Sequence, residues 1–351
     1  MAAEPSAQPV SAVAITGAGG WLGTALLEAI GAAREARPTS YPVVRALVRH
    51  PSEVGNVLEA ASFAQVFIGD VRDRSVVDEL LDGMEGAAVI HAAGVIHPAR
   101  AAEFESVNVG GTRTAVESAS RVGARRIVHV SSNSAFGCNP TPEDSFRANE
   151  PFNPYMGYGR SKMEAEIVAG TAGDPQLERV IIRPPWFYGP YQPLRQTRFF
   201  ASVRRGRFPV VGDGLNRRSM VQVEALAQAA LQACVAPHAA GRSYWIADAH
   251  PYTMLEVIRA VREALELEGL AVSGRIPRLP GAVADIARLA DAAIQSRGGY
   301  VQEIHVLSEM NQTIACDVSD AVRDLGYDPP GELLPGMRRA IAWCRQTGVE
   351  L

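Results

Sequence analysis

The stretch TGAGGWLGTALLEAI, residues 16–30, decides the fold of this chain. Its glycines follow a short apolar run and lead straight into a helical pattern. Glycine permits a sharp turn and lets a diphosphate approach the backbone amides, while the helix N-terminus offers that anion a positive dipole. Between a strand and a helix, such a triad predicts a dinucleotide-binding loop; a tight turn without a ligand is the alternative. We expect this loop to bind the cofactor through Gly17, Gly20, Trp21, Leu22 and Gly23.

Short β-branched runs alternate with helical patterns through the first half of the chain. We expect strands at residues 12–16, 43–48, 65–68, 88–91, 127–131 and 180–183. Most of these runs are continuously apolar, as in strands that are buried on both faces. The alternation therefore predicts an α/β fold with a Rossmann-type doubly wound parallel sheet.

The second half of the chain changes character after RPPWFYGPYQP, residues 183–193, which is rich in proline and aromatic residues. Isolated strand patterns such as YWIA, residues 244–247, are there mixed with several helices. We expect a flexible tail at 1–10, a dinucleotide-binding domain at 11–189 and a smaller, mostly helical substrate-binding lobe at 190–351. This division leaves open that some segments after residue 190 pack in the dinucleotide-binding domain.

The composition argues against several classes of protein. The 351 residues carry a formal net charge of -4 and no lysine- or arginine-rich arm, which argues against a nucleic-acid partner. The four cysteines are far apart and show neither a disulfide framework nor the spacing of metal ligands, so we expect no metal and a cytoplasmic location. No segment reaches the ~20 apolar residues of a membrane span.

Residues 279–294, LPGAVADIARLADAAI, form an amphipathic helical pattern. We expect this helix to pack over the pocket or core of the protein itself. A contact with a membrane surface or a partner is the alternative.

The end of the second expected strand bears on the choice of cofactor. An acidic residue there holds the ribose 2'-hydroxyl of NAD, whereas an arginine suits the 2'-phosphate of NADP. This strand ends in Arg49, which favours NADP(H) over NAD(H), unless Arg49 is a plain surface residue. Asp70 and Val71 follow the third strand, where an adenine would lie. The small residues Ala92, Ala93 and Gly94 follow the fourth strand and let a cofactor pack against them.

A tyrosine and a lysine are four residues apart in YMGYGRSKMEAE, residues 155–166. On a helix, Tyr158 and Lys162 would share a face and point into one pocket. A nearby ammonium is expected to lower the pKa of the phenol and make it a usable general acid or base. The hydroxyls of Ser131, Ser132 and Ser134 lie near the carboxyl end of the fifth expected strand, where one of them can hold a substrate oxygen.

Together these motifs resemble those of the extended short-chain dehydrogenases/reductases. The resemblance rests on TGxxGxxG at Gly17, Gly20 and Gly23, Asp70, the HAA segment at 91–93, NVxGT at 108–112, SSNSAFG at 131–137, YxxxK at Tyr158 and Lys162, and RPxxxYGP at 183–190. The order and spacing agree over nearly the whole chain. Carried over by position, Ser132 is the catalytic hydroxyl and Asn108 supports the site. Pro185 and Phe187 would lie near the nicotinamide.

The resemblance implies an NAD(P)-dependent oxidoreductase that moves a hydride between the nicotinamide and a secondary alcohol or ketone, with Ser132, Tyr158 and Lys162 as the reactive group. Asn133 and Ser134 replace the Asp-Glu pair of the family's dehydratases, so a dehydratase is not expected. Apolar residues near the site predict a fairly apolar small molecule. The candidate substrate contacts are Ser134, Val95, Ile96, Trp186 and Arg218.

Two other functions remain open at this point. By resemblance, Arg218 occupies the position of an arginine that binds diphosphate in nucleotide-sugar enzymes. A 4-epimerase with tightly bound NAD is therefore the first alternative. An ion pair within the lobe would explain Arg218 equally well. A non-catalytic dinucleotide-binding regulator is the second. The resemblance also implies a homodimer that is built from the helices at 108–122 and 158–169.

Overall fold

The computed structural model describes residues 12–351, so the expected tail at 1–10 lies outside the described residues. Its main element is a sheet of seven strands in the order β11-β6-β5-β4-β1-β2-β3. All neighbouring strands of this sheet are parallel. The strands are β1 (Ala12–Thr16), β2 (Val43–Val48), β3 (Gln65–Ile68), β4 (Ala88–His91), β5 (Arg126–Val130), β6 (Glu178–Arg183) and β11 (Arg242–Trp245).

This sheet confirms the predicted fold class. The first four strands have the expected bounds, β5 begins and ends one residue earlier than expected, and β6 begins two residues earlier. The strand order reverses between β1 and β4, and a crevice forms at the carboxyl ends of the strands where such a reversal occurs.

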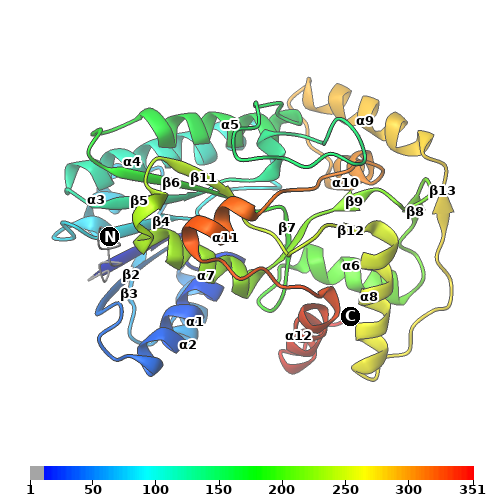
Figure 1. The fold of residues 1–351 in the computed structure, drawn as a ribbon, viewed down its shortest axis with the longest axis horizontal. Coiled ribbons are helices and arrows are strands. Elements are labelled where there is room, and N and C mark those ends of the chain that lie inside the picture. The colour runs from blue at the N-terminus through cyan, green and yellow to red at the C-terminus, as the bar shows by residue number, and fades with distance from the viewer. Residues whose placement is uncertain (1–11) are drawn as a thin grey trace, which may run out of the picture.

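Helices cover both faces of the sheet (Figure 1). One face carries α1 (Trp21–Ala36), α2 (Val54–Ala60) and α7 (Val223–Val235). The other carries α3 (Arg74–Leu81), α4 (Gly111–Arg121) and α5 (Met156–Thr171). Successive residues of a strand point to opposite faces, so Val13 and Ile15 enter the first core while Ala14 enters the second.

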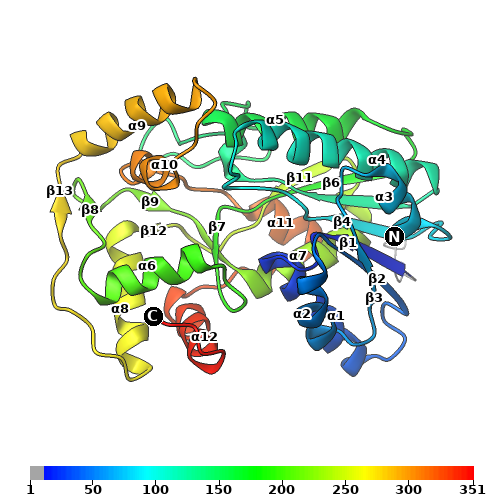
Figure 2. The same ribbon diagram turned by 180° about the vertical axis from the view of Figure 1, so that it is seen from behind.

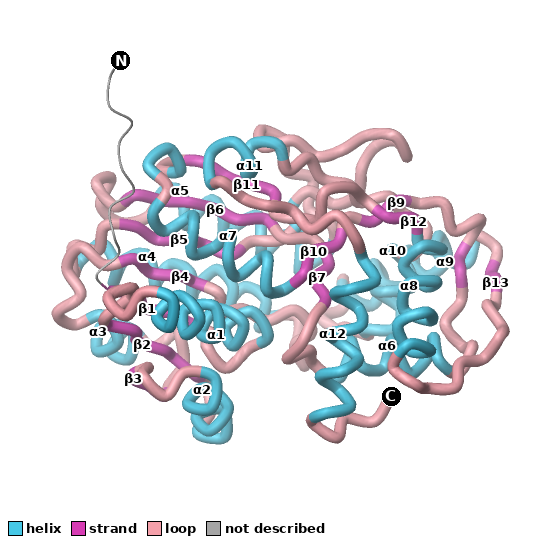
Figure 3. The backbone as a smooth tube through the Cα atoms, turned by 60° about the horizontal axis from the view of Figure 1, so that its bottom comes forward, coloured by secondary structure: helices cyan, strands magenta, loops and turns pink. Residues whose placement is uncertain are grey.

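A smaller lobe lies beside the sheet, and Figure 3 shows β7 and β10 between the two parts. Its core is formed by α6 (Leu194–Arg204), α8 (Met254–Leu267) and α12 (Leu333–Gln346). Three two-stranded pairs complete it: β7 (Trp186–Tyr188) with β10 (Met220–Gln222), β9 (Arg217–Arg218) with β12 (Tyr252–Thr253), and β8 (Val210–Val211) with β13 (Arg278–Leu279).

Part of the chain beyond residue 190 packs in the main domain. Helix α7 packs against α1, and β11 adds a strand beside β6. The YWIA stretch therefore begins inside the large sheet, because Tyr244 and Trp245 belong to β11. A parallel neighbour requires a crossover connection, and α7 lies between β6 and β11 in the chain. The short α11 (Ser319–Leu325) covers β11.

The helix expected at 279–294 is α9 (Ala282–Gln295), which packs against α10 (Gln302–Glu309) and approaches α5 (Figure 2). Ala284, Ala287 and Asp291 are buried in these contacts, whereas Ile286 and Leu289 are exposed. Within residues 12–351, no helix is long and apolar enough to cross a membrane.

Candidate active site

The glycine loop between β1 and α1 is packed too tightly for side chains. Gly17 has a φ of 74°, and a Cβ at this residue would lie 2.8 Å from the Cα of Ala93. A Cβ at Gly23 would collide with the carbonyl group of Gly17. The loop therefore lies against the segment that follows β4, as close backbone packing at a dinucleotide site requires.

The start of α1 fits a diphosphate. Its N-cap is Gly20, which has no side chain to accept hydrogen bonds from the first amides of the helix. Uncapped amides and the helix dipole together form a site for an anion. Trp21 closes one side of this region, since its ring packs 4.9 Å from that of Phe187 and its indole N–H donates to the carbonyl of Pro190 at 2.6 Å.

The residues that were expected to hold the adenosine lie at the ends of β2 and β3. Arg49 is half exposed, and its Nε lies 4.0 Å from Asp70 Oδ2. Arg72 donates to both oxygens of Asp70, at 2.9 and 2.6 Å, and this hydrogen bonding lowers the pKa of the Asp70 carboxyl. Val71 is buried and would contact any Cβ placed on Gly111.

Glu53 was missed by the sequence analysis. Its Oε2 accepts hydrogen bonds from the backbone amides of Arg49 and His50, at 2.9 and 3.4 Å. A Cβ on Gly19 would lie 2.8 Å from the same carboxylate oxygen, so the carboxylate lies beside the glycine loop. Its position in sequence, four residues after Arg49, was the available signal. An acid at this corner can accept a hydrogen bond from a ribose 2'-hydroxyl.

Asn108 joins three segments of the site. It lies in the π-helical turn η2 (Phe104–Gly110), and its amide exchanges hydrogen bonds with the backbone of Val95 at 2.8 and 3.0 Å. Its Nδ2 also donates to Ser161 Oγ at 2.9 Å, and Ser161 in turn donates to the carbonyl of Tyr158 at 2.8 Å. This network fixes the loop after β4 against the first turns of α5.

Ser132, Tyr158 and Lys162 meet at the carboxyl end of β5. Lys162 is buried, and its Nζ donates to the carbonyl of Val130 at 2.7 Å. Burial lowers the pKa of Lys162 to about 8. Ser132 precedes the turn η3 (Asn133–Ala135), and its Oγ accepts a hydrogen bond from the Ser134 amide at 3.2 Å. Ser132 also acts on the pKa of the Tyr158 phenol.

The expected effect of Lys162 on Tyr158 was wrong. Burial raises the pKa of the Tyr158 phenol, while the Ser132 hydroxyl and the charge of Arg195 act in the lowering direction. Lys162 is directed to the Val130 carbonyl instead. The phenol is therefore protonated at neutral pH, which is the form that donates a proton.

The expected substrate contacts divide into two groups. Val95 is hydrogen-bonded to Asn108 and Ser134 to Ser132, so these two lie near the reactive group, and Ile96 follows Val95 in the chain. The Trp186 indole packs against Phe199 at 5.1 Å and donates to Gln196. Arg218 donates from Nη2 to the carbonyl of Glu309 at 2.8 Å, so it is engaged within the lobe. Pro185 is buried between β6 and β7.

An aromatic wall faces the reactive tyrosine. The ring of Phe104 lies 5.8 Å from that of Tyr158 and 5.7 Å from that of Tyr300. The Tyr300 hydroxyl is hydrogen-bonded to His97 Nδ1 at 2.5 Å. The charge of Arg195, in the first turn of α6, acts in the lowering direction on the pKa of the Tyr158 and Tyr300 phenols, and the sequence analysis did not single it out.

Two buried histidines lie beneath the site. His91 Nε2 donates to Thr112 Oγ1 at 3.0 Å, because the Thr112 hydroxyl itself donates to the Asn108 carbonyl. His91 Nδ1 then accepts from Thr16 at 2.8 Å, so the ring is neutral. His129 packs 5.4 Å from His91. Burial lowers the pKa of His91 to about 3 and that of His129 well below its usual value.

We expect the free energy of unfolding to decrease as the pH falls below about 6.5. The unfolded chain binds protons that neutral His91 and His129 do not, so each histidine destabilises the fold by about 1.4 kcal/mol per pH unit until its folded pKa is reached. Urea unfolding at a series of pH values measures this slope. His129→Phe should make the dependence of the unfolding free energy on pH shallower by about the contribution of one histidine. His238→Gln replaces a histidine at an exposed position and should leave this slope unchanged. Equal slopes in wild type and His129→Phe would contradict the prediction.

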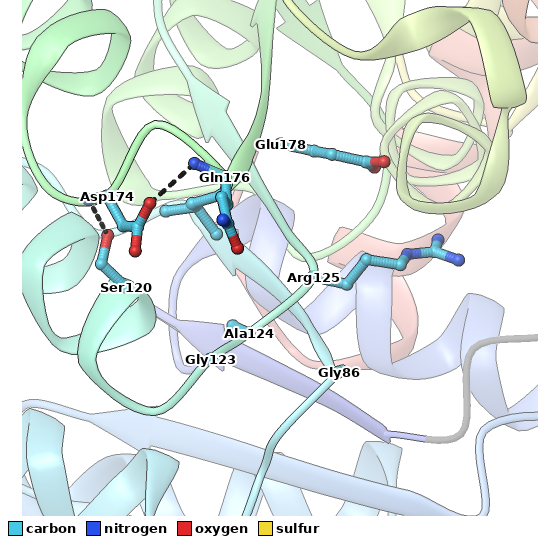
Figure 4. A pocket seen from close by; sticks show the side chains of 9 residues that line it. Gly86, Ser120, Gly123, Ala124, Arg125, Asp174, Gln176 and Glu178 are labelled. Atoms are coloured by element: carbon cyan, nitrogen blue, oxygen red, sulfur yellow. Dashed lines mark hydrogen bonds between the residues drawn. The ribbon is translucent and has the colours of Figure 1, made fainter.

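A depression at the opposite edge of the sheet is unrelated to these residues (Figure 4). It is lined by residues at or just before the amino ends of β4, β5 and β6, including Gly86, Arg125 and Glu178. The Asp174 amide there donates to Ser120 Oγ at 3.0 Å, and the Asp174 carboxylate accepts from the Gln176 amide at 2.8 Å. The reactive group lies at the carboxyl edge instead.

Comparison with known proteins shows the family to which the chain is similar. The sequence model of the NAD dependent epimerase/dehydratase family matches residues 13–247. An uncharacterized protein, y4nL, of Sinorhizobium fredii is 44% identical over 96% of each chain. Sterol demethylase protein B of Methylococcus capsulatus is 29% identical over 95% of this chain and 98% of its own.

A third relative is a 4-hydroxy-2-methyl-3-oxo-4-farnesyl-3,4-dihydroquinoline-1-oxide ketoreductase of Stigmatella aurantiaca, which is 30% identical over 75% of each chain. Among solved structures, the dTDP-glucose 4,6-dehydratase DesIV of Streptomyces venezuelae, with NAD and TYD bound, has a TM-score of 0.73. It is 23% identical, and the similarity covers 95% of this chain and 97% of that one. This likeness shows the fold.

Proposed function

Because this chain belongs to the NAD-dependent epimerase/dehydratase family of extended short-chain dehydrogenases/reductases, we propose that it is an oxidoreductase acting on a secondary alcohol or ketone. The observation that carries this proposal is the meeting of Ser132, Tyr158 and buried Lys162 at the carboxyl end of β5. The reacting molecule would be fairly small and apolar.

The residues of the loop after β1 would hold the NAD(P) cofactor of the family, with Phe187 and Pro185 near its nicotinamide. The bound nicotinamide would supply or accept the hydride. In the reducing direction, Tyr158 donates its phenolic proton to the substrate oxygen. Ser132 holds that oxygen as negative charge develops on it, and a fixed donor at this place lowers the barrier. Lys162 anchors the ribose and orients the site.

The surroundings of Tyr158 support an apolar substrate. Phe104 and Tyr300 present rings to the phenol side of the site, and Val95 and Ile96 follow the glycine of the β4 loop. The name of the Stigmatella relative describes the reduction of a ketone on a farnesylated ring, which agrees with this character.

A nucleotide-sugar 4-epimerase has less support, because the rings of Phe104 and Tyr300 near Tyr158 favour an apolar substrate over a sugar diphosphate. An epimerase returns its hydride to the substrate and keeps NAD bound. The two proposals therefore differ in whether a cofactor remains on the purified protein.

We propose NADP(H) as the preferred cofactor, with Arg49 as the contact for its 2'-phosphate. Isothermal titration of the purified protein should show exchangeable binding, tighter for NADP(H) than for NAD(H). Arg49→Ala should weaken NADP+ binding by about 10- to 100-fold, the value of a charge-assisted hydrogen-bonded contact, and leave NAD+ binding nearly unchanged. Glu53→Gln should strengthen NADP+ relative to NAD+, because it removes a negative charge beside the 2'-phosphate.

Arg205→Ala, at an exposed position in the lobe, is the matched control and should affect neither cofactor. If Arg49→Ala weakens both cofactors equally or neither, Arg49 is not the 2'-phosphate contact. NAD that co-purifies tightly, detected by absorbance and mass spectrometry, would contradict the oxidoreductase proposal and place the epimerase first.

A further inference from the structure

The last residue of α9, Gln295, contacts the first turn of α5, which carries Tyr158. Gln295 Oε1 accepts a hydrogen bond from the Gly157 amide at 2.9 Å. A Cβ at Gly157 would lie 3.1 Å from this oxygen and 3.4 Å from Cδ2 of Phe104, so glycine permits the close approach. Gln295 and Gly157 are 138 positions apart in the chain, so the contact depends on how α9 packs against α5.

This contact serves a helix start that lacks a local cap. The first amides of a helix have no partner within the helix and need an acceptor from outside it. The N-cap of α5 is Tyr155, and tyrosine lacks the short side-chain oxygen with which serine, threonine, asparagine or aspartate caps a helix. Gln295 supplies an acceptor from a different helix. Because the Gly157 amide lies one residue before Tyr158, this cap holds the backbone from which the reactive phenol projects.

A buried carboxylate fixes the orientation of the Gln295 amide. Gln295 Nε2 donates to Asp291 Oδ1 at 2.9 Å, and Asp291 Oδ2 is hydrogen-bonded to His305 Nδ1 at 2.7 Å. Asp291 is fully buried and His305 is 7% exposed. An ionised carboxylate only accepts hydrogen bonds, so the NH2 group of Gln295 must face Asp291. The amide oxygen is thereby directed to Gly157.

The same turn of α5 also packs on η3, which follows Ser132. The Tyr155 amide donates to the Ser134 carbonyl at 3.0 Å, and a Cβ at Gly159 would collide with that oxygen. Met156, the first residue of α5, has a φ of 51°, in the left-handed region that favours glycine. A residue keeps such a conformation only where its surroundings hold it. The contacts with η3 and α9 together provide such surroundings.

We propose that Gln295 is a positioning residue for Tyr158 and that Asp291 acts through Gln295. The inference rests on the proposed function, in which Tyr158 is the proton donor. The hydrogen bond to the Gly157 amide holds the first turn of α5 against η3 and so sets the position of the phenol relative to Ser132. Proton transfer needs this geometry, and a misplacement of about 1 Å can lower a rate by about 100-fold.

The test uses variants that change the hydrogen bonds and keep the side chains at nearly the same size. Gln295→Met removes the acceptor, and Gln295→Glu places a second carboxylate against Asp291. The double variant Gln295→Glu with Asp291→Asn exchanges the two groups. The introduced amide then donates to the introduced carboxylate, so the contacts with Gly157 and His305 are both kept. Gln346→Met is the matched control, because Gln346 is the exposed last residue of another 14-residue helix.

Two measurements separate positioning from a loss of stability. The first gives kcat and the KM for NADPH, with 2-decanone as the ketone. The second is fluorine NMR of protein labelled with fluorotyrosine, in which the Tyr158 resonance is identified by its loss in Tyr158→Phe. We expect Gln295→Met and Gln295→Glu to lower kcat by about 10- to 100-fold, to leave the KM for NADPH nearly unchanged and to shift the Tyr158 resonance. The double variant should restore both quantities, and Gln346→Met should behave as wild type.

A Tyr158 resonance in Gln295→Met that matches wild type would overturn the inference, whatever the effect on kcat. A shifted resonance with unchanged kcat would overturn it as well. If the double variant recovers neither quantity, the hydrogen bond is not the cause and the inference fails. If wild type reduces no ketone and oxidises no alcohol, the proposed function fails. The placement of Tyr158 by Gln295 is then decided by the resonance alone, and a shift that the double variant reverses supports it.

Discussion

Replacing Tyr158 with Phe is expected to lower kcat by about 10²- to 10⁴-fold, the range that a positioned general acid contributes. The substitution removes one hydroxyl and keeps the ring, so the contact with Phe104 at 5.8 Å is retained. Ser132 would still hold the substrate oxygen, but no proton donor would be in place. Cofactor affinity should change little, because Lys162 keeps its own hydrogen bond to the Val130 carbonyl.

Tyr155→Phe is the matched control, since it removes the same atom three residues earlier. The Tyr155 hydroxyl hydrogen-bonds to Ser308 rather than to Ser132, so turnover should be retained within a few-fold. Steady-state kinetics with NADPH and a ketone, together with cofactor titration, give both quantities. Comparable turnover by Tyr158→Phe and wild type would show that Tyr158 is not the proton donor.

The sequence predicts the main sheet well because each of its strands has a clear apolar pattern within a few consecutive residues. Parallel strands that are buried on both faces appear as continuous apolar runs, and four of them have the expected bounds. The place of β11 could not be predicted in the same way. Its partner β6 ends at Arg183, and several helices and short strands lie between the two in the chain. A short strand pattern in the sequence does not indicate which sheet that strand joins.

The site was predictable where its residues are neighbours in sequence. Tyr158 and Lys162 are one turn apart on α5, so their spacing alone brings them to one face. Glu53 follows Arg49 by only four residues, but its place beside the glycine loop depends on how separate segments pack, so the spacing alone did not reveal it. The pKa of Tyr158 was predicted in the wrong direction, since burial exceeds the effect of nearby charge and burial cannot be measured from the sequence.

Replacing Arg183 with Met is expected to reduce the free energy of unfolding by about 3–5 kcal/mol, the effect of leaving one member of a buried ion pair alone. Arg183 and Glu166 are 5% and 2% exposed. The guanidinium donates to Glu166 at 2.8, 3.1 and 3.2 Å and to the Ala148 carbonyl at 2.7 Å. It also lies 4.3 Å from the centre of the Phe136 ring. Chemical unfolding of the purified variant measures the loss.

Two comparisons separate the buried pair from a general effect of losing an arginine. Arg242→Met removes an exposed arginine whose partner Asp324 keeps its ion pair with Arg323, so it should reduce stability by less than about 1 kcal/mol. The double variant Glu166→Met with Arg183→Met removes the unpaired carboxylate as well, so it should recover most of the loss. If the double variant is as unstable as Arg183→Met, the loss comes from packing around Phe136 and not from an isolated charge. Because this pair ties β6 to α5, which carries Tyr158 and Lys162, recovery of stability without recovery of turnover would indicate that it also positions the reactive group.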